Sequence, residues 1–197
     1  MWTDSMSRKE LILQTATQLF ARKGFRDTVM TELSAATGVA GSTIFYHYKT
    51  KEDLFLSILA GVRELVISDF EGYFNQRKFD TGLEMVEGAV WFYLHLAGAR
   101  EELFLLLHRH YPYELAEVNP VCREHLEAIH NCFVNIFENA IRKGQTDGSI
   151  VDLPAAKTSL ILYSMVDGMV RFNTYKLYQA GSLYNELVAA LRRMLTG

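Results

Sequence analysis

The chain has 197 residues, of which 49% are hydrophobic, and its net charge is -3. The sequence contains only three prolines, long stretches with helical periodicity and no alternating strand pattern. We therefore predict an all-α protein with a small N-terminal domain, the head, and a larger C-terminal domain, the body. The sequence lacks the roughly 18 apolar residues in a row of a membrane span, and its N-terminus lacks the apolar segment of a signal peptide, so a cytoplasmic protein with no membrane partner is expected.

The first predicted helix covers about residues 8–23. Ser7 and Glu10 form the Ser-x-x-Glu pattern of a capping box at its start, and Gly24 ends it. Its inner face is expected to consist of Leu11, Ala16, Leu19 and Phe20.

Two short helical patterns follow and meet at Gly38. The first covers residues 29–37, and the hydroxyl of Thr28 is expected to cap its start. Gly38 ends it, because a tight turn after a helix needs a residue in the left-handed region. The second pattern covers about residues 42–48. Helices joined so closely are typical of a helix-turn-helix.

The second of these short helices has two different faces. Ile44 and Tyr48, four residues apart, are expected to face inward. The outward side chains include aromatic rings, an imidazole and hydroxyls, which together need a partner surface. Packing of these rings against the first helix is the alternative, above all for Phe45. The side chains expected to enter the major groove of DNA are Ser42, Thr43, Tyr46 and His47.

The segment GVAGSTIFYHYKTKEDLF resembles the helix-turn-helix of the TetR family of bacterial transcriptional repressors. The resemblance continues upstream through KELILQTATQLFARKGFRDTVMTELSAATGV and covers about residues 8–59. The positions typical of the family are Gly24, Phe25, Thr28, Gly38, Val39, Tyr48, Lys51 and Leu54.

Three positions depart from the family pattern. Ala40 stands where the family often has serine, which removes a helix cap. Ser42 stands where glycine is frequent. Phe45 replaces a frequent tyrosine and cannot donate to a phosphate.

Lys51 begins the next helix, expected to reach about Phe74, with Thr50 and Asp53 as its capping pair. We expect Lys51 and Thr28 to bind DNA phosphate, since an ammonium and free helix amides could face the same anion. An ordinary surface lysine is the alternative. The charge distribution agrees, because seven bases and four acids give residues 1–51 a charge of +3, and 13 bases and 19 acids give the rest -6.

The helix of about residues 81–99 is apolar on nearly every face from Ala89 onward, so burial all round is expected, with His95 stranded inside it. A core histidine with an internal partner is the alternative. Tyr111-Pro112-Tyr113 is expected to break the following helix, and a polar turn over residues 144–148 is expected to end a later one. The remaining helices are predicted over residues 101–110, 120–143, 154–178 and 183–195.

Gly168 lies within a predicted helix, at a cost of about 1 kcal/mol relative to alanine, which indicates close approach of another helix. A single short recognition helix reads too few base pairs for an operator, so a homodimer on a palindromic site is expected. Its interface is assigned to the last two helices, including Leu183, Leu187, Leu191 and Leu195.

The body is expected to hold a small hydrophobic effector in an aromatic cavity with Asp167 and Arg171 at one end. A purely structural pair is the alternative for these two residues. Aromatic and aliphatic groups favour a lipid-like or planar aromatic compound over a sugar or nucleotide. The predicted ligand-binding residues are Trp91, His95, Phe133, Phe137, Tyr163, Asp167 and Arg171.

Other chemistries have less support. His108, His110, Cys122 and His125 could form a zinc-like set, but their spacing fits no recognised finger or ribbon, and no metal site is predicted. Cys122 and Cys132 are ten residues apart on one predicted helix, about 15 Å, so both thiols are expected to be free. Without a nucleophile elbow, phosphate loop or dinucleotide fingerprint, no enzyme and no cofactor are predicted.

The sequence therefore predicts two functional domains, a helix-turn-helix DNA-binding domain over residues 1–51 and a ligand-binding and dimerisation domain over residues 52–197. The resemblance implies a homodimeric repressor that leaves its double-stranded DNA operator when a ligand binds the body. The alternative is a DNA-binding protein with no small-molecule input, whose body serves only dimerisation or a protein partner.

Overall fold

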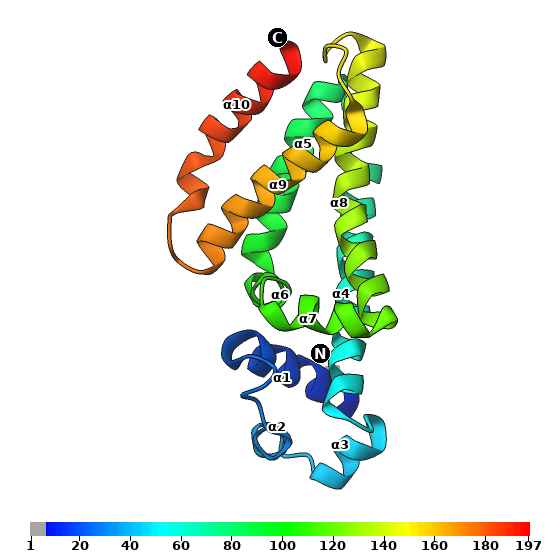
Figure 1. Cartoon of the computed structure of the whole chain (residues 1–197), viewed down its shortest axis with the longest axis vertical. Coiled ribbons are helices and arrows are strands. Elements are labelled where there is room, and N and C mark those ends of the chain that lie inside the picture. Colours follow the sequence, from blue (N-terminus) through cyan, green and yellow to red (C-terminus); the bar gives the residue numbers. More distant parts are fainter. Residues whose placement is uncertain (1–6) are drawn as a thin grey trace, which may run out of the picture. The chain divides into compact units, whose positions relative to one another are not determined.

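The computed structural model describes residues 7–197, and every regular element among them is helical, which confirms the predicted all-α fold. The helices, labelled in Figure 1, are α1 (Arg8–Lys23), α2 (Met30–Thr37), α3 (Gly41–His47), α4 (Lys51–Asn75), α5 (Gly82–Ala99), α6 (Glu101–Leu107), α7 (His110–Val118), α8 (Pro120–Asp147), α9 (Ala155–Thr174), the short 3-10 helix η1 (Ala180–Leu183) and α10 (Tyr184–Thr196). Across residues 7–197, none of these helices has both the length and the apolar character needed to span a bilayer.

The chain forms two compact units. The first contains the residues up to Glu64 together with Glu102–Leu126, and the second contains Leu65–Glu101 together with Glu127–Gly197. Helices α4 and α8 each contribute to both units. This division by contacts differs from the functional division expected after residue 51, which stays a prediction.

In the first unit, α1 begins with the predicted capping box. The Ser7 hydroxyl accepts from the amide of Glu10 at 3.2 Å, and the Glu10 carboxylate accepts from the amide of Ser7 at 2.7 Å. The buried stripe of α1 differs slightly from the prediction, because Leu11 and Leu19 are only half-buried. The residues of α1 that pack inward are Ile12, Ala16, Phe20 and Ala21.

Tyr111-Pro112-Tyr113 does not break a helix, so that prediction is wrong. Helix α6 ends earlier, at Leu107, and the tripeptide lies in the first turn of α7. Proline is tolerated there because first-turn amides have no intrahelical acceptor. The segment also serves the core: Pro112 is buried, and the ring of Tyr111 stacks on that of Phe25 with centroids 3.7 Å apart.

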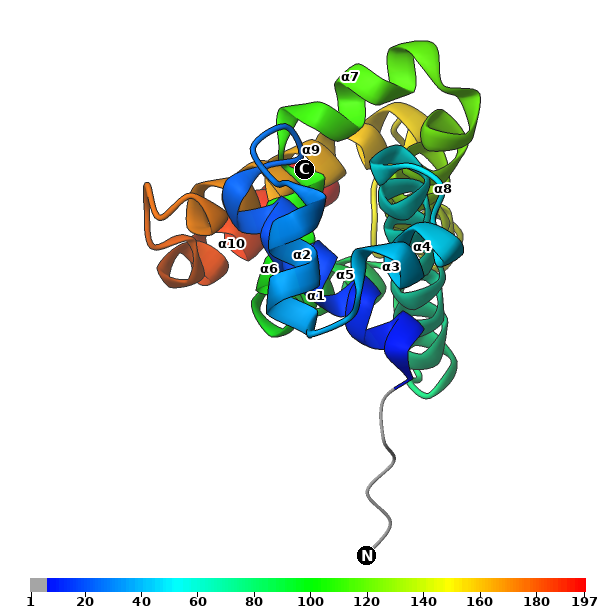
Figure 2. The same cartoon turned by 90° about the horizontal axis from the view of Figure 1, so that it is seen from below.

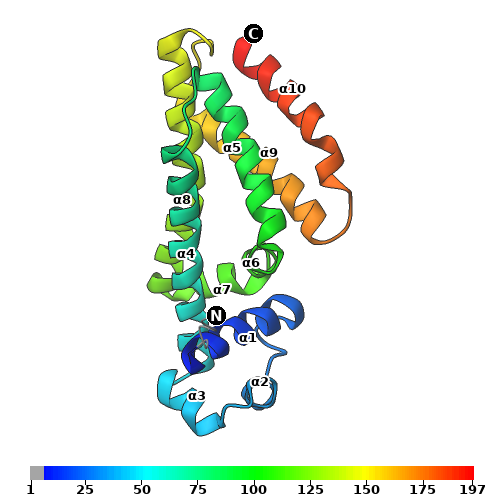
Figure 3. The same cartoon turned by 180° about the vertical axis from the view of Figure 1, so that it is seen from behind.

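In the second unit, α9 crosses α5, and α10 packs along α5 (Figures 1 and 3). The core is aromatic: the ring of Phe70 meets those of Phe92 and Phe133 edge to face, with centroids 4.5 and 4.8 Å away. Leu187, Leu191 and Leu195 of α10 are buried within the chain, so they are not free to form the dimer surface to which the sequence assigned them.

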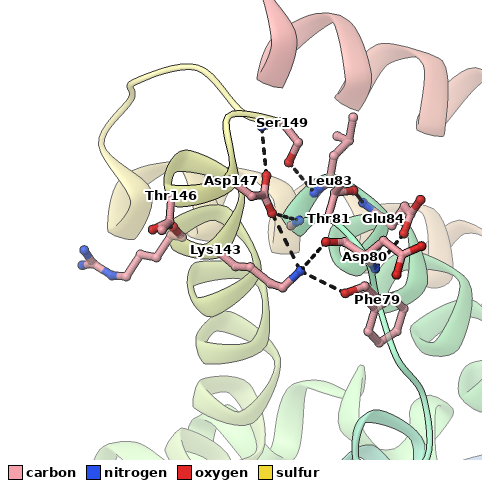
Figure 4. Close-up of polar contacts among 11 residues, drawn as sticks. Phe79, Asp80, Thr81, Leu83, Glu84, Lys143, Thr146, Asp147 and Ser149 are labelled. Atoms are coloured by element: carbon pink, nitrogen blue, oxygen red, sulfur yellow. Dashed lines mark hydrogen bonds and ion pairs between the residues drawn. The ribbon is translucent and has the colours of Figure 1, made fainter.

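The end of α8 is tied to the start of α5 by polar contacts (Figure 4). The ammonium of Lys143 donates to the carbonyls of Phe79 and Asp80, at 3.0 Å each. The Asp147 carboxylate accepts from the amides of Gly82 and Ser149, at 2.7 and 2.9 Å.

Gly144 lies inside α8, which continues to Asp147, so the turn predicted over residues 144–148 begins later than expected. The chain turns at Gly148, the last residue of that range, whose φ is +81°. Gly144 is needed for packing: a Cβ on Gly82 would lie 2.0 Å from the Gly144 nitrogen, and a Cβ on Gly144 would lie 2.5 Å from the Ile150 side chain. The two helices touch here backbone to backbone.

We expect Gly82→Ala to lower the free energy of unfolding by about 1–3 kcal/mol or more, because its methyl group meets backbone that has no rotamer to change. Gly98→Ala on the same helix is the matched control, since nothing lies within 4 Å of its Cβ position. The control should be neutral or stabilising by up to about 1 kcal/mol. Urea unfolding followed by circular dichroism measures both, and equal stability of the two variants would contradict the close contact.

Candidate functional site

Helices α2 and α3 are joined by a turn of three residues that begins at Gly38 (Figure 2). Gly38 has φ +66° and ψ +9°, which confirms the predicted left-handed residue. Side chains of α2 support the turn, because the Ser34 hydroxyl donates to the Val39 carbonyl at 2.7 Å and the Thr37 hydroxyl accepts from the Val39 amide at 3.3 Å. Side chains of α2 therefore hold the turn that leads into α3.

Thr28 does not cap α2, contrary to the prediction. The residue at the N-cap is Val29, whose side chain makes no capping hydrogen bond. Thr28 is 1% exposed, and its hydroxyl donates to the carbonyl of Gly24 at 2.8 Å. The threonine thus closes the loop between α1 and α2.

Helix α3 has the two faces that the sequence predicted. Ile44 and Tyr48 are buried, at 0% and 3% exposure, and fix the helix to the core of the first unit. On the opposite side Tyr46 is 76% exposed and Phe45 46%, so neither ring is buried against another helix. Ser42 and His47 are also exposed, and Thr43 is half-buried. The outer face is a row of hydroxyl, aromatic and imidazole groups open to a partner.

Lys51 is held by the protein itself. Its ammonium donates to the carbonyls of Phe25 and Thr28, at 2.7 and 2.8 Å, and lies 4.3 Å from the centre of the Phe25 ring. Desolvation lowers the pKa of Lys51, and the charge of Asp27 partly opposes this shift. These contacts join the start of α4 to the loop before α2, and they leave one ammonium hydrogen for another acceptor.

Lys49 was missed by the sequence interpretation. It is exposed, directly follows the motif, and its ammonium lies 5.9 Å from the centre of the Tyr46 ring. The Tyr46 ring in turn meets the His47 ring edge to face, with centroids 5.4 Å apart. The sequence signal for Lys49 was a basic residue close to the aromatic pair Tyr46 and His47. Lys49 adds positive charge at the end of the outer face of α3.

Several predicted ligand-binding residues do meet in the second unit. Phe133 and Phe137 are fully buried, and the ring of Tyr163 stacks on that of Phe133 at 5.5 Å. The Tyr93 hydroxyl donates to the Asp167 carboxylate at 2.6 Å, and burial raises the pKa of Tyr93, which keeps this donor protonated. This aromatic and polar group is hereafter the Tyr93 cluster.

The Tyr93 cluster also includes a residue that the sequence did not single out. The ring nitrogen Nδ1 of His130 lies 2.6 Å from the Tyr163 hydroxyl, and the two rings are tilted against each other. The signal was available in the sequence: His130 lies three residues before Phe133, on the same face of one helix.

Trp91, His95 and Arg171 are exposed, unlike the buried rings of the Tyr93 cluster. His95 was expected inside the core, and that expectation is wrong: its ring stacks on that of Trp91 at the surface, with centroids 4.9 Å apart. Because the side chains of Trp91 and His95 are exposed, α5 is not buried all round. Ligand contact by these residues stays a prediction.

The cysteines and histidines of the middle of the chain are dispersed. His108, Cys122 and His125 are buried, but in residues 7–197 no three His, Cys, Asp or Glu side chains gather in a group suited to a metal ion. Both thiols are free, and desolvation raises the pKa of Cys122 and of Cys132 to about 11, so neither is a reactive thiolate near neutral pH.

The tight turn between α2 and α3, with an exposed second helix anchored from behind, defines a helix-turn-helix DNA-binding protein. Comparison with known families agrees: residues 12–58 match the model described as bacterial regulatory proteins, tetR family. The helix-turn-helix segment of this chain is therefore similar to that of the tetR family of bacterial regulators.

Relatives match most of the chain at low identity. The transcriptional repressor BepR of Brucella suis is 24% identical over 85% of this chain and 80% of its own, and the regulator QacR of Staphylococcus aureus is 26% identical over 85% and 86%. The structure of the regulator FadR of Bacillus subtilis in complex with stearoyl-CoA has a TM-score of 0.73 at 20% identity, over 92% of this chain and 96% of that one. This last likeness supports the fold alone.

Proposed function

We propose that the protein is a ligand-released repressor that binds a palindromic operator as a homodimer. The observation that carries the proposal is the outer face of α3, where large side chains are exposed although the helix is anchored firmly from behind. BepR is named a repressor, which supports the direction of control.

In this proposal, base edges in the major groove are contacted by Ser42, Thr43, Tyr46 and His47. Lys49 adds a phosphate contact, because it is exposed next to Tyr46. Phosphate contact by Lys51 and Thr28 has less support from the geometry. The Thr28 side chain is buried. Two hydrogens of the Lys51 ammonium are donated to backbone carbonyls, so only the third is available to a phosphate.

The homodimer is assigned to one face of α9. The exposed apolar side chains Ile161, Met165 and Phe172 recur along it, with Gly168 between them. Nothing lies within 4 Å of the Cβ position of Gly168 in the single chain, so the backbone there is open to a second copy. An isologous pairing of two α9 helices would cover this row and place two α3 helices on one DNA site.

The effector is assigned to the surroundings of the Tyr93 cluster, where buried rings provide apolar area and the carboxylate of Asp167 provides a polar anchor. A lipid-like compound is proposed because FadR, which has a similar fold, was solved in complex with stearoyl-CoA. A repressor of this kind requires that the ligand bind more tightly to the conformation that does not bind DNA.

We expect stearoyl-CoA to raise the Tm of the protein and to lower its affinity for operator DNA, since one binding event drives both changes. The measurements are thermal unfolding and fluorescence anisotropy of labelled operator, with free CoA as the control for the head group. If stearoyl-CoA changes neither quantity, a lipid-like effector is rejected, and the alternative of a body without small-molecule input gains support.

A further inference from the structure

A surface hollow of about 290 Å³ lies in the second unit, between the end of α4, the start of α5 and the beginning of α10. Figures 1 and 3 show the ends of these helices. Four aromatic side chains line the hollow, namely Tyr73, Phe79, Trp91 and Tyr184. Neither the helix-turn-helix nor the Tyr93 cluster uses this hollow.

The guanidinium of Arg77 already lies against the aromatic rings of the hollow. The guanidinium carbon of Arg77 lies 5.1 Å from the centre of the Tyr73 ring and 5.7 Å from that of Trp91. These two rings are nearly parallel, at 24°, with centroids 5.8 Å apart. Their faces attract positive charge through the ring quadrupole.

Arg77 is held loosely enough to be displaced. The residue is exposed, and its contacts are the two rings and one hydrogen bond, from Nη1 to the Tyr73 hydroxyl at 2.6 Å. Arg77 follows the end of α4, four residues after Tyr73, and its guanidinium reaches the rings at the end of a long side chain with several rotatable bonds. A ligand that displaces Arg77 meets the ring surface that the guanidinium covered, whereas Phe92 still stacks on Tyr73 and His95 on Trp91.

Charges at the rim favour a cation over an anion once Arg77 has left. Glu84 and Glu87 line the hollow, and Lys78 is then the only base among its lining residues in the described chain. Glu87 is partly neutralised by Arg192, whose Nη2 lies 2.8 Å from its carboxylate, so Glu84 and the rings supply most of the attraction.

We propose that this hollow binds an organic cation with a weakly hydrated, methylated or delocalised charge, and that Arg77 acts as a built-in competitor for the site. Ring faces select such cations because little hydration is lost on contact, whereas sodium keeps its water shell. The proposal does not depend on operator release or on the assignment of the effector to the Tyr93 cluster.

The test is isothermal titration calorimetry of the full chain, without DNA, with benzyltrimethylammonium chloride at constant ionic strength. Saturable binding is expected, and benzyl alcohol, which has the ring but not the charge, should bind more weakly. Arg77→Gln should raise the affinity for the cation about two- to fivefold, since it removes the competitor. Trp91→Leu should lower it by a similar factor, because one ring is lost.

Arg142→Gln is the matched control, because it removes an exposed arginine that pairs with Glu138 on its own helix. Its affinity for the cation should equal that of the parent. In a Trp2→Phe background Trp91 is the single tryptophan, and its fluorescence should change along the same binding curve. Absence of saturable binding, or an affinity that Arg77→Gln leaves unchanged or lowers, would overturn the proposal.

Discussion

Replacing Tyr46 and His47 together by alanine is expected to abolish sequence-specific DNA binding while leaving the protein folded. Each side chain, if it contacts base edges, contributes on the order of 1–3 kcal/mol, and a dimer loses each contact twice. Stability should change by less than about 0.5 kcal/mol, because both residues are exposed and face away from the core. Fluorescence anisotropy with an operator duplex obtained by selection from random DNA measures the loss.

His110→Ala with Tyr113→Ala is the matched control for this double variant. It removes the same two residue types from an exposed face of α7, in the same compact unit. The control should bind the operator as tightly as the parent. Parent-like affinity of the Tyr46 and His47 variant would refute the assignment of α3 as the recognition helix.

Replacing Ile161 and Met165 together by glutamate is expected to convert the proposed homodimer into a monomer of 22.5 kDa. The two side chains are 52% and 36% exposed in the single chain, so the substitutions should not disturb its core. In a two-fold pairing of α9 they would bury four like-charged carboxylates, each without a partner. Penalties of several kcal/mol per buried charge should raise the dissociation constant more than about a thousandfold.

Light scattering with size-exclusion chromatography measures the mass directly, and circular dichroism checks that the helices are retained. Asn135→Glu with Asn139→Glu on α8 is the matched control, since it adds two charges with the same spacing to another exposed helix face. A glutamate variant that stays dimeric, or a parent that is already monomeric at micromolar concentration, would refute the α9 interface.

The sequence predicted the head well because local signals determine it. The capping box at Ser7, the left-handed Gly38 and the inward pair Ile44 and Tyr48 each depend on residues close in the chain, and all three are observed. The same reasoning failed for Thr28. Its hydroxyl could accept from an amide at the start of α2 or donate to the carbonyl of Gly24, and only the folded loop decides between the two.

The body was harder to predict because its burial depends on which helices meet. The run from Ala89 to Ala99 is apolar enough for burial all round, yet the side chains of His95 and Trp91 are exposed. Glycine often follows the end of a helix, but Gly144 lies within one and makes a close contact with Gly82, 62 positions away in the sequence. Neither fact follows from periodicity. The stacking of Arg77 on Tyr73 was visible as an i, i+4 pair, but only the structure brings Trp91 beside it.

The most direct test of the account is selection of DNA from a random duplex library by the purified protein, followed by sequencing. If two α3 helices read one operator as a homodimer, the enriched DNA should be an inverted repeat, with half-site centres about one helical turn, 10–10.5 base pairs, or a multiple of this apart. The Tyr46 and His47 variant should enrich no sequence. Enrichment of a single unrepeated site, or of the same inverted repeat by that variant, would contradict the account.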